Sequence, residues 1–189
     1  KEAIVVEMPR HNQWSWLRIA ASLFVLMGVG WFAYTNLFKN QSQEMVSIQS
    51  KNESLADTLP DGSIITLNRL SSITYPEDFG KGSKRPVTLK GEAFFDVHPD
   101  KTKPFVITVN EVTVTVLGTS FNIKSNGRGT EVIVETGLVE VGKSNESIKL
   151  KPNEKVIIEE GDGKLTKEKS EDELYKYYRT KKFVCNDLP

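Results

Sequence analysis

The chain has 189 residues, enough for one domain with a sizeable hydrophobic core and a smaller appendage. Lysine and arginine together number 25, as do aspartate and glutamate, and this balance argues against nucleic acid as the main partner because phosphate binding needs a clustered basic surface. The single cysteine, Cys185, excludes an internal disulfide.

The first predicted element is the apolar segment 17–38, LRIAASLFVLMGVGWFAYTNLF, whose only charged residue is Arg18. As a helix it would be roughly 33 Å long, about the thickness of the hydrocarbon core of a bilayer. Aromatic rings and one cation near its ends are the expected membrane anchors: Trp14, Trp16, Arg18, Trp31 and Tyr34. The sequence therefore predicts a transmembrane helix.

Two alternatives to a membrane span stay open. A buried core helix would show a polar stripe, which this segment lacks. A cleaved signal peptide would have a shorter apolar run followed by a small-residue cleavage site, and the following residues KNQSQE offer none. Lys1, Arg10 and Arg18 precede the core of the segment and Lys39 and Lys51 follow it, which weakly favours a cytoplasmic N-terminus.

The next segment, residues 39–54, is polar and is predicted to form a stalk, apart from a possible short strand at 45–48. From Leu55 onward, short runs rich in Val, Ile, Thr and Phe are separated by Gly, Pro, Asn and Asp. The expected strands are 63–68, 87–97, 105–109, 112–117, 131–135, 138–141, 148–150 and 155–159. Turns or corners are expected at 60–62, 110–111, 136–137, 152–153 and 161–163. This spacing predicts an all-β domain, either a sandwich, a roll or a solenoid.

Helix is expected again only near the end of the chain. Ser170 and the acidic residues 171–173 are typical of an N-cap and a first helical turn, and the helix would run to about Lys181. Residues 183–186 are predicted to begin a new strand.

The segment GEAFFDVHPD, residues 91–100, is the best candidate for chemistry because it holds Glu92, Asp96, His98 and Asp100. On a single strand over 87–97, Glu92, Phe94, Asp96 and His98 share one face, while the other face is apolar. However, a rise of about 3.3 Å per residue separates Glu92 and Asp96 by roughly 13 Å, too far for one ion with ligands at about 2.0–2.6 Å. We therefore predict a solvent-facing strand face rather than a metal or catalytic site.

No other catalytic signal is present in the sequence. The motifs G-x-S-x-G, the P-loop and H-E-x-x-H are missing, and Gly118-Thr119-Ser120 is interpreted as a backbone corner between two strands. Cys185 has no histidine near it in the sequence. We therefore expect no catalytic residues, no cofactor and no metal.

Several short motifs follow one another in a specific order: LPDGS at 59–63, Leu67-Asn68, Tyr75-Pro76, Phe79, Arg85, LKGEAFFDV at 89–97, KPFV at 103–106 and LGTSFN at 117–122. This order resembles the FecR family of single-pass transmembrane regulators of extracytoplasmic-function sigma factors in Gram-negative bacteria. The resemblance covers roughly residues 55–160. It implies that the motif residues specify a fold rather than a reaction: Pro60, Asp61, Gly62, Gly91, Glu92, Phe94, Phe95, Asp96, Pro104, Phe105, Gly118, Thr119 and Phe121.

The resemblance also implies a location and partners. Residues 1–16 would be the remnant of a cytoplasmic part that binds the sigma factor, with 17–38 in the inner membrane and 55–168 in the periplasm. The periplasmic part would receive the signalling domain of a TonB-dependent transporter. Residues 169–189 would hold a helix and the start of a small α+β domain, similar to the short domain of secretins and TonB-dependent receptors. Because both end domains of the family are nearly missing, we expect the chain to be a fragment.

Two other functions remain open from the sequence. A membrane-anchored periplasmic β domain that binds glycan or serves envelope assembly would show the same helix and strands. An anchored enzyme would need a convergent cluster of carboxylates or histidines, and none is evident in the sequence.

Overall fold

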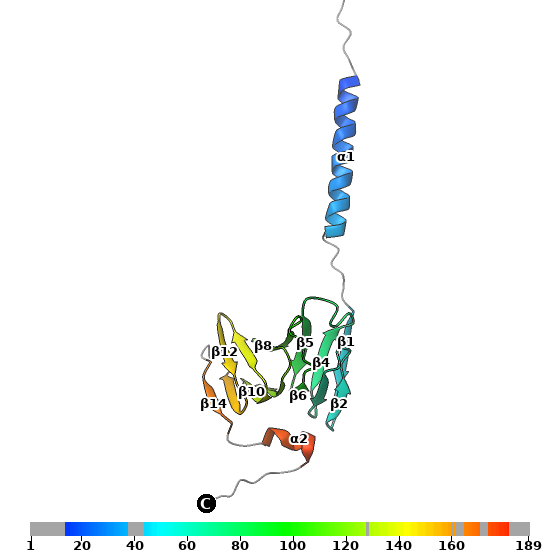
Figure 1. The fold of residues 1–189 in the computed structure, drawn as a ribbon. Coiled ribbons are helices and arrows are strands. Elements are labelled where there is room, and N and C mark those ends of the chain that lie inside the picture. The colour runs from blue at the N-terminus through cyan, green and yellow to red at the C-terminus, as the bar shows by residue number, and fades with distance from the viewer. Residues whose placement is uncertain are drawn as a thin grey trace, which may run out of the picture. The chain divides into compact units, whose positions relative to one another are not determined.

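The computed structural model describes residues 14–37, 44–127, 129–159, 161, 165–170 and 174–181. The chain divides into two units, Lys1–Ser42 and Gln43–Pro189. The first unit contains helix α1 (Trp14–Leu37), and the described part of the second contains fourteen strands and a short helical segment (Figure 1). This bears out the mainly β fold class.

Helix α1 forms where the sequence predicts a helix, and it begins three residues earlier than expected. From Ile19 to Tyr34 nearly every side chain is exposed, although most of these residues are apolar. Over the described residues, no helix combines the length and the apolar character needed to cross a bilayer.

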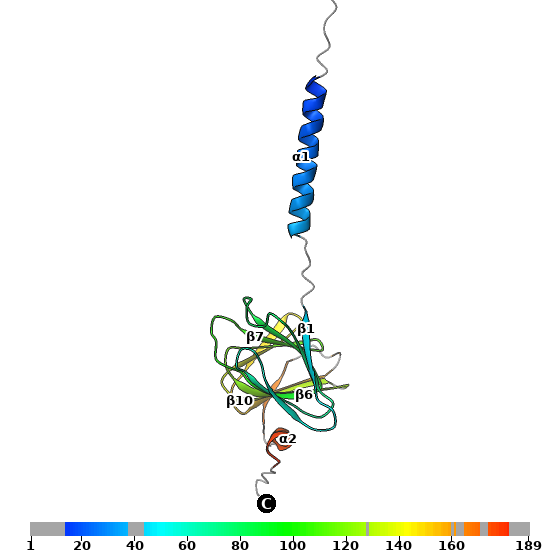
Figure 2. The ribbon, with the colours of Figure 1, turned by 90° about the vertical axis from the view of Figure 1, so that its right-hand side faces the viewer.

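The second unit consists of two seven-stranded sheets. In spatial order, sheet A contains β1 (Met45–Gln49), β4 (Ser72–Pro76), β5 (Arg85–Lys90), β7 (Phe105–Val109), β8 (Val112–Val116), β11 (Val139–Lys143) and β12 (Glu146–Leu150). Sheet B contains β14 (Lys167–Lys169), β13 (Glu154–Glu159), β10 (Gly129–Thr136), β9 (Ser120–Asn126), β6 (Glu92–Asp96), β3 (Ile64–Leu67) and β2 (Leu55–Thr58). Neighbouring strands are antiparallel, except that β5 pairs with β7 in parallel. The sheets face each other in a sandwich-like arrangement (Figure 2).

Successive hairpins alternate between the two sheets. The chain passes from β4 and β5 in sheet A to β6 in sheet B, then to β7 and β8 in A, β9 and β10 in B, and β11 and β12 in A. The corner between β10 and β11 contains Gly137 at φ +79, and a bulge lies just before it between Val134 and Thr136. The predicted corner at Thr136-Gly137 is therefore confirmed. Because of this path, every hairpin contributes one face to a single shared core.

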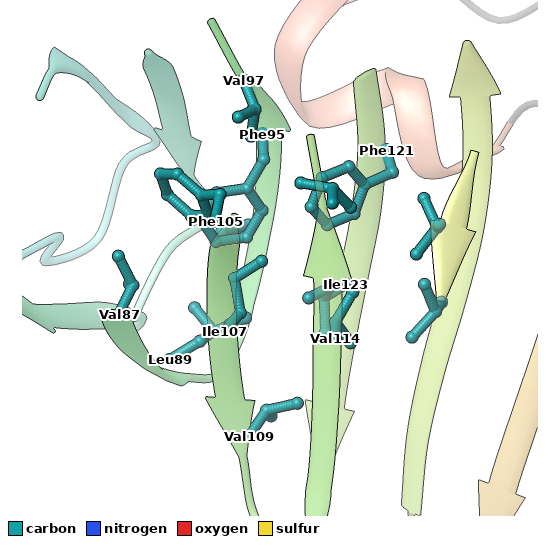
Figure 3. Packing of buried hydrophobic residues seen from close by; sticks show 14 of the residues in the cluster. Val87, Leu89, Phe95, Val97, Phe105, Ile107, Val109, Val114, Phe121 and Ile123 are labelled. Carbon is teal, nitrogen blue, oxygen red and sulfur yellow. The ribbon is translucent and has the colours of Figure 1, made fainter. Parts of the chain in front are cut away.

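The centre of that core is aromatic. The rings of Phe95 and Phe121 stack with their centroids 5.3 Å apart, and Phe105 meets Phe95 edge-on at 6.2 Å (Figure 3). All three rings are completely buried, and each such burial contributes about 1.5–3 kcal/mol to the free energy of folding. Strands from both sheets are therefore joined through one aromatic cluster.

A buried ion pair fixes one end of the sandwich. The guanidinium of Arg85, at the start of β5, donates to Asp61 with an Nη1–Oδ2 distance of 2.6 Å. The same guanidinium donates to the backbone carbonyls of His98 and Lys103, each at 2.9 Å. Because Arg85 is only 2% exposed, loss of either charge would leave the other buried and unpaired. This arrangement gives a structural reason for the Pro-Asp-Gly-Ser turn and for Arg85.

The prediction of one continuous strand over 87–97 is wrong. Strand β5 ends at Lys90 in sheet A, β6 begins at Glu92 in sheet B, and Gly91 between them has φ +91. A Cβ atom at Gly91 would lie 2.5 Å from Ser71 Oγ and 3.0 Å from Ser71 Cα, so only glycine fits this corner. The break is not visible in the sequence, because Leu89 before it and Ala93 after it both face the core, as they would on one continuous strand.

Other elements differ from the expectations in smaller ways. The possible short strand at 45–48 is confirmed as edge strand β1 (Met45–Gln49), and its pairing with β4 makes this part of the predicted stalk belong to the fold. Strands β2, β4 and β14 were not expected, and no range was predicted for β9, which follows the expected corner at 118–120. The hairpin of β7 and β8 at Asn110-Glu111 is confirmed. The predicted C-terminal helix is present as a 3₁₀ turn, η1 (Leu174–Lys176), and α2 (Tyr177–Thr180). Residues 171–173, the predicted strand at 183–186 and most of the predicted turn at 161–163 lie outside the described residues.

Replacing Gly91 with alanine should destabilise the β unit by about 3 kcal/mol, since positive φ and the close approach of Ser71 each carry a cost. Gly142→Ala is the matched control, because its Cβ would meet only ordinary contacts at 3.7 and 3.8 Å and should change stability by less than about 1 kcal/mol. Urea denaturation of the chain in mild detergent measures both. Equal midpoints for the two variants would contradict the described corner.

Candidate helix-docking site

The outer face of sheet B carries the last described segment of the chain. We name η1 and α2 together the C-terminal helix, and Figure 1 shows it at one side of the β unit, beyond the strands. Lys181 ends this helix in the left-handed conformation at φ +56, and its N–H donates to the carbonyl of Tyr177 at 2.8 Å. The helix is too short to be stable alone in water, so contacts with the sheet must hold it.

Strand register places one row of side chains beneath this helix. We name it the docking row: Thr66 on β3, Phe94 on β6, Asn122 on β9 and Ile133 on β10 are paired in succession. Strand alternation points these residues away from the core, yet Phe94, Asn122 and Ile133 are only 7%, 1% and 4% exposed. They are buried because the C-terminal helix covers this part of the sheet.

A polar chain ties the helix to the docking row. The hydroxyl of Tyr178 donates to Asn122 Oδ1 at 2.8 Å, and Asn122 Nδ2 donates to Glu92 Oε1 at 3.2 Å. Asn68 Nδ2 donates to the other carboxylate oxygen of Glu92 at 2.8 Å. Burial, followed by the charge of Glu92, raises the pKa of Tyr178 above its usual range, so the hydroxyl stays protonated and remains a donor.

Charged contacts hold the other side of the same helix. The guanidinium carbon of Arg179 lies 3.5 Å from the centre of the Phe94 ring, within the range of a cation–π contact. Glu135 at the end of β10 accepts from both Arg179, at 3.1 Å, and Lys176, at 3.3 Å. One carboxylate therefore bridges two cations that lie on one face of the helix.

These contacts correct the interpretation of segment 91–100 as a solvated strand face. Phe94 is buried under Arg179, and half-buried Glu92 accepts two side-chain amides. The other ionisable residues do not converge: Asp96 accepts from Ser120 at 2.8 Å, and Asp100 accepts from Thr102. The hydrogen bonds from Thr102 lower the pKa of the Asp100 carboxyl. Within the described residues, no group of three His, Cys, Asp or Glu side chains could hold a metal ion.

The remaining predicted residues lie in two places. In α1, Trp31 and Tyr34 are exposed, while the side chains of Trp14, Trp16 and Arg18 lie outside the described part. In the β unit the motif residues build corners and core: a Cβ at Gly118 would lie 2.6 Å from Pro99, and Thr119 is buried beside it.

Sequence reasoning missed the helix-facing residues Asn122, Ile133, Glu135 and Tyr178. Asn122 did carry a signal, because a polar amide in the middle of a strand rich in apolar residues needs a partner. The pairing of that amide with a tyrosine 56 residues later follows only from the tertiary fold.

Comparisons with known proteins agree with this architecture. A family model described as FecR protein matches residues 46–140. Crystal structures at 2.50 and 1.65 Å of a candidate anti-sigma factor from Parabacteroides distasonis are both 36% identical to the chain, with TM-scores of 0.63 and 0.62. The matches cover 67% and 66% of this chain, which spans about 60% of the length of those structures. No curated protein matches the chain.

Replacing Glu135 with glutamine should loosen the C-terminal helix, because both cations lose their shared partner. Exposed and half-exposed ion pairs contribute up to about 1 kcal/mol each, so trypsin cleavage after Lys176 and Arg179 should become roughly five-fold faster. Glu140→Gln, on the outer face of sheet A, is the matched control and should cleave at the wild-type rate. Identical rates for all three proteins would show that Glu135 does not hold the helix.

Proposed function

The chain belongs to the FecR family, and we propose that it transmits a signal across the bacterial inner membrane to an extracytoplasmic-function sigma factor. The observation that carries this proposal is the family match over 46–140, supported by the likeness to a candidate anti-sigma factor at 36% identity. The described part of the β unit offers a docking surface and no convergent reactive side chains, which suits a regulator better than an enzyme.

We propose that α1 anchors the chain in that membrane, with residues 1–16 on the cytoplasmic side and the β unit in the periplasm. Support comes from the 17–38 segment, in which Arg18 is the only charge, and from apolar side chains exposed on every side of the helix. Phe24, Met27 and Phe32 are each at least 70% exposed. Such a surface is unfavourable in water and favourable in lipid.

The C-terminal helix would then connect two parts of the receptor. In this proposal a receiving domain follows residue 181 and contacts the signalling domain of a TonB-dependent transporter, while the sigma factor binds on the cytoplasmic side. The docked helix would pass a change in the receiving domain to the β unit through Tyr178, Arg179 and their partners. What supports this role is the position of the helix on the outer face of sheet B and its dependence on sheet contacts.

The topology can be tested with reporter fusions after Gln43. We expect an alkaline phosphatase fusion to be active and a green fluorescent protein fusion to be dark, because both reporters would be exported. As a control, Leu26→Lys with Val29→Lys places two charges in the apolar run and should abolish phosphatase activity, since each central charge costs about 2.5–3.5 kcal/mol for insertion. An inactive phosphatase fusion with a fluorescent partner would contradict the proposed orientation.

The regulatory role can be tested with the full-length gene in the bacterium that carries it, using a sigma-dependent reporter. Phe95→Asp buries an unpaired carboxylate at a completely buried position, a cost of several kcal/mol, and should abolish the normal response to the inducing signal. Glu140→Gln should keep that response.

The double variant Asp96→Ala with His98→Ala separates regulation from chemistry. We expect it to keep the response, because Asp96 bonds to Ser120 and neither residue belongs to a group of side chains in the described part of the chain that could hold a metal ion. A folded double variant that loses the response would favour a catalytic or metal-dependent role, and transcription that is unaffected by Phe95→Asp would contradict the regulatory role.

A further inference from the structure

Ser50 begins an unusual polar connection inside the β unit. It follows edge strand β1 directly and is only 2% exposed. Its N–H donates to the Ser71 carbonyl at 2.9 Å, its hydroxyl accepts from the Ser71 N–H at 2.9 Å, and the hydroxyl also lies in reach of the carbonyls of Asn68 and Ser71. The segment that leads into the β unit is thus fastened to residues 68–71.

Residues 68–71 are in turn fastened to the Gly91 corner. The Ser71 hydroxyl accepts from the N–H of Glu92 at 2.9 Å, and the N–H of Asn68 donates to the carbonyl of Glu92 at 2.9 Å. The missing side chain at Gly91 is what allows Ser71 to approach this closely. The main chain of Glu92 is therefore hydrogen-bonded to segment 68–71, which contacts Ser50.

The side chain of Glu92 is linked to the C-terminal helix. Its carboxylate accepts from Asn122, which in turn accepts from Tyr178 on the C-terminal helix. Continuous hydrogen bonds thus run from Ser50, where the chain enters the β unit, to Tyr178, where the described chain leaves it. Asn122 uses both its donor and its acceptor in this chain, so each bond orients the next.

We propose that Glu92 is a relay residue, through which docking of the C-terminal helix and seating of the segment around Ser50 stabilise each other. The relay is a property of the β unit and does not depend on what the protein regulates. When Tyr178 leaves, Asn122 loses its donor and the Glu92 carboxylate loses a fixed partner, which weakens its hold on Asn68. Asn68 lies in the segment that Ser50 contacts, so the weaker hydrogen bond between Glu92 and Asn68 also loosens the segment around Ser50.

Segment 68–71 is suited to respond to such a loss. Leu70 adopts φ +56, a conformation that leucine rarely takes, and its side chain is 74% exposed. Its N–H donates to the carbonyl of Lys51 at 2.8 Å, beside Ser50. A strained residue of this kind persists only while surrounding bonds hold it, so weaker bonds from Glu92 should release it.

Hydrogen exchange of the full chain in detergent micelles tests the relay, with Tyr178→Phe removing a single hydroxyl. We expect the amides of Ser50, Leu70 and Ser71 to exchange roughly five-fold faster, the effect of losing one net hydrogen bond. Thr113→Val, which removes an exposed hydroxyl from strand β8 in sheet A, is the control and should leave these amides unchanged. Amides of core strand β9 should keep their rates, which excludes global unfolding.

Coupling between two sites is reciprocal, which provides the second arm. Ser50→Ala should accelerate exchange of the Lys181 amide by a similar factor, whereas Ser47→Ala on strand β1 should not. In the double variant of Ser50 and Tyr178, the acceleration should be smaller than the product of the two single effects. If Ser50→Ala does not fold, Glu92→Gln replaces it and should accelerate exchange at both ends.

Two outcomes would overturn the relay. In one, Tyr178→Phe accelerates exchange at Lys181 and leaves Ser50, Leu70 and Ser71 at their wild-type rates, so that the helix docks independently. In the other, the variants change neither end, and the hydrogen-bond chain then carries no coupling.

Discussion

The corner at Gly91 is the constraint on which the rest of the β unit depends. Here the chain leaves one sheet and enters the other without a Cβ atom, and Ser71 fills the space that a side chain would need. Because the corner preserves the two-residue alternation, Leu89 and Phe95 both reach the same core from different sheets. A bulkier residue would displace Ser71, and with it the bonds that hold Ser50 and the backbone of Glu92.

The contacts of two outward-facing residues after this corner explain why segment 91–97 contains both charged and aromatic side chains. Glu92 and Phe94 are adjacent on the outer face of β6, one meeting an amide and the other a guanidinium. Phe95, between Phe94 and Asp96 in sequence, points the opposite way and stacks on Phe121. One short strand therefore supplies both a ring at the centre of the core and a residue that supports the C-terminal helix.

The sequence predicted the β class, most strands and the core face of segment 87–97, because these follow from local alternation and turn residues. It did not predict the break at Gly91, since alternation is the same on a continuous strand and across this corner. It also placed Glu92 and Phe94 in solvent, because their partners are remote in sequence: Arg179 covers Phe94, and Glu92 is linked through Asn122 to Tyr178. Ser50 shows the same limit: its segment is polar and resembles a stalk, and only tertiary bonds to Ser71 show that it belongs to the fold.

The ion pair of Arg85 and Asp61 differs in burial from the ion pairs that hold the C-terminal helix. Arg85 donates to Asp61 and to two backbone carbonyls, Asp61 also accepts from Ser63, and the burial of the pair makes any rearrangement costly. Glu135, Lys176 and Arg179 are half-exposed, so their contacts exchange with water at little cost. The buried ion pair therefore holds the loops around Asp61 and His98, whereas the half-exposed ion pairs hold the short C-terminal helix. A helix held by weak ion pairs, one cation–π contact and one buried hydroxyl is therefore attached less firmly to sheet B than the strands of that sheet are joined to one another.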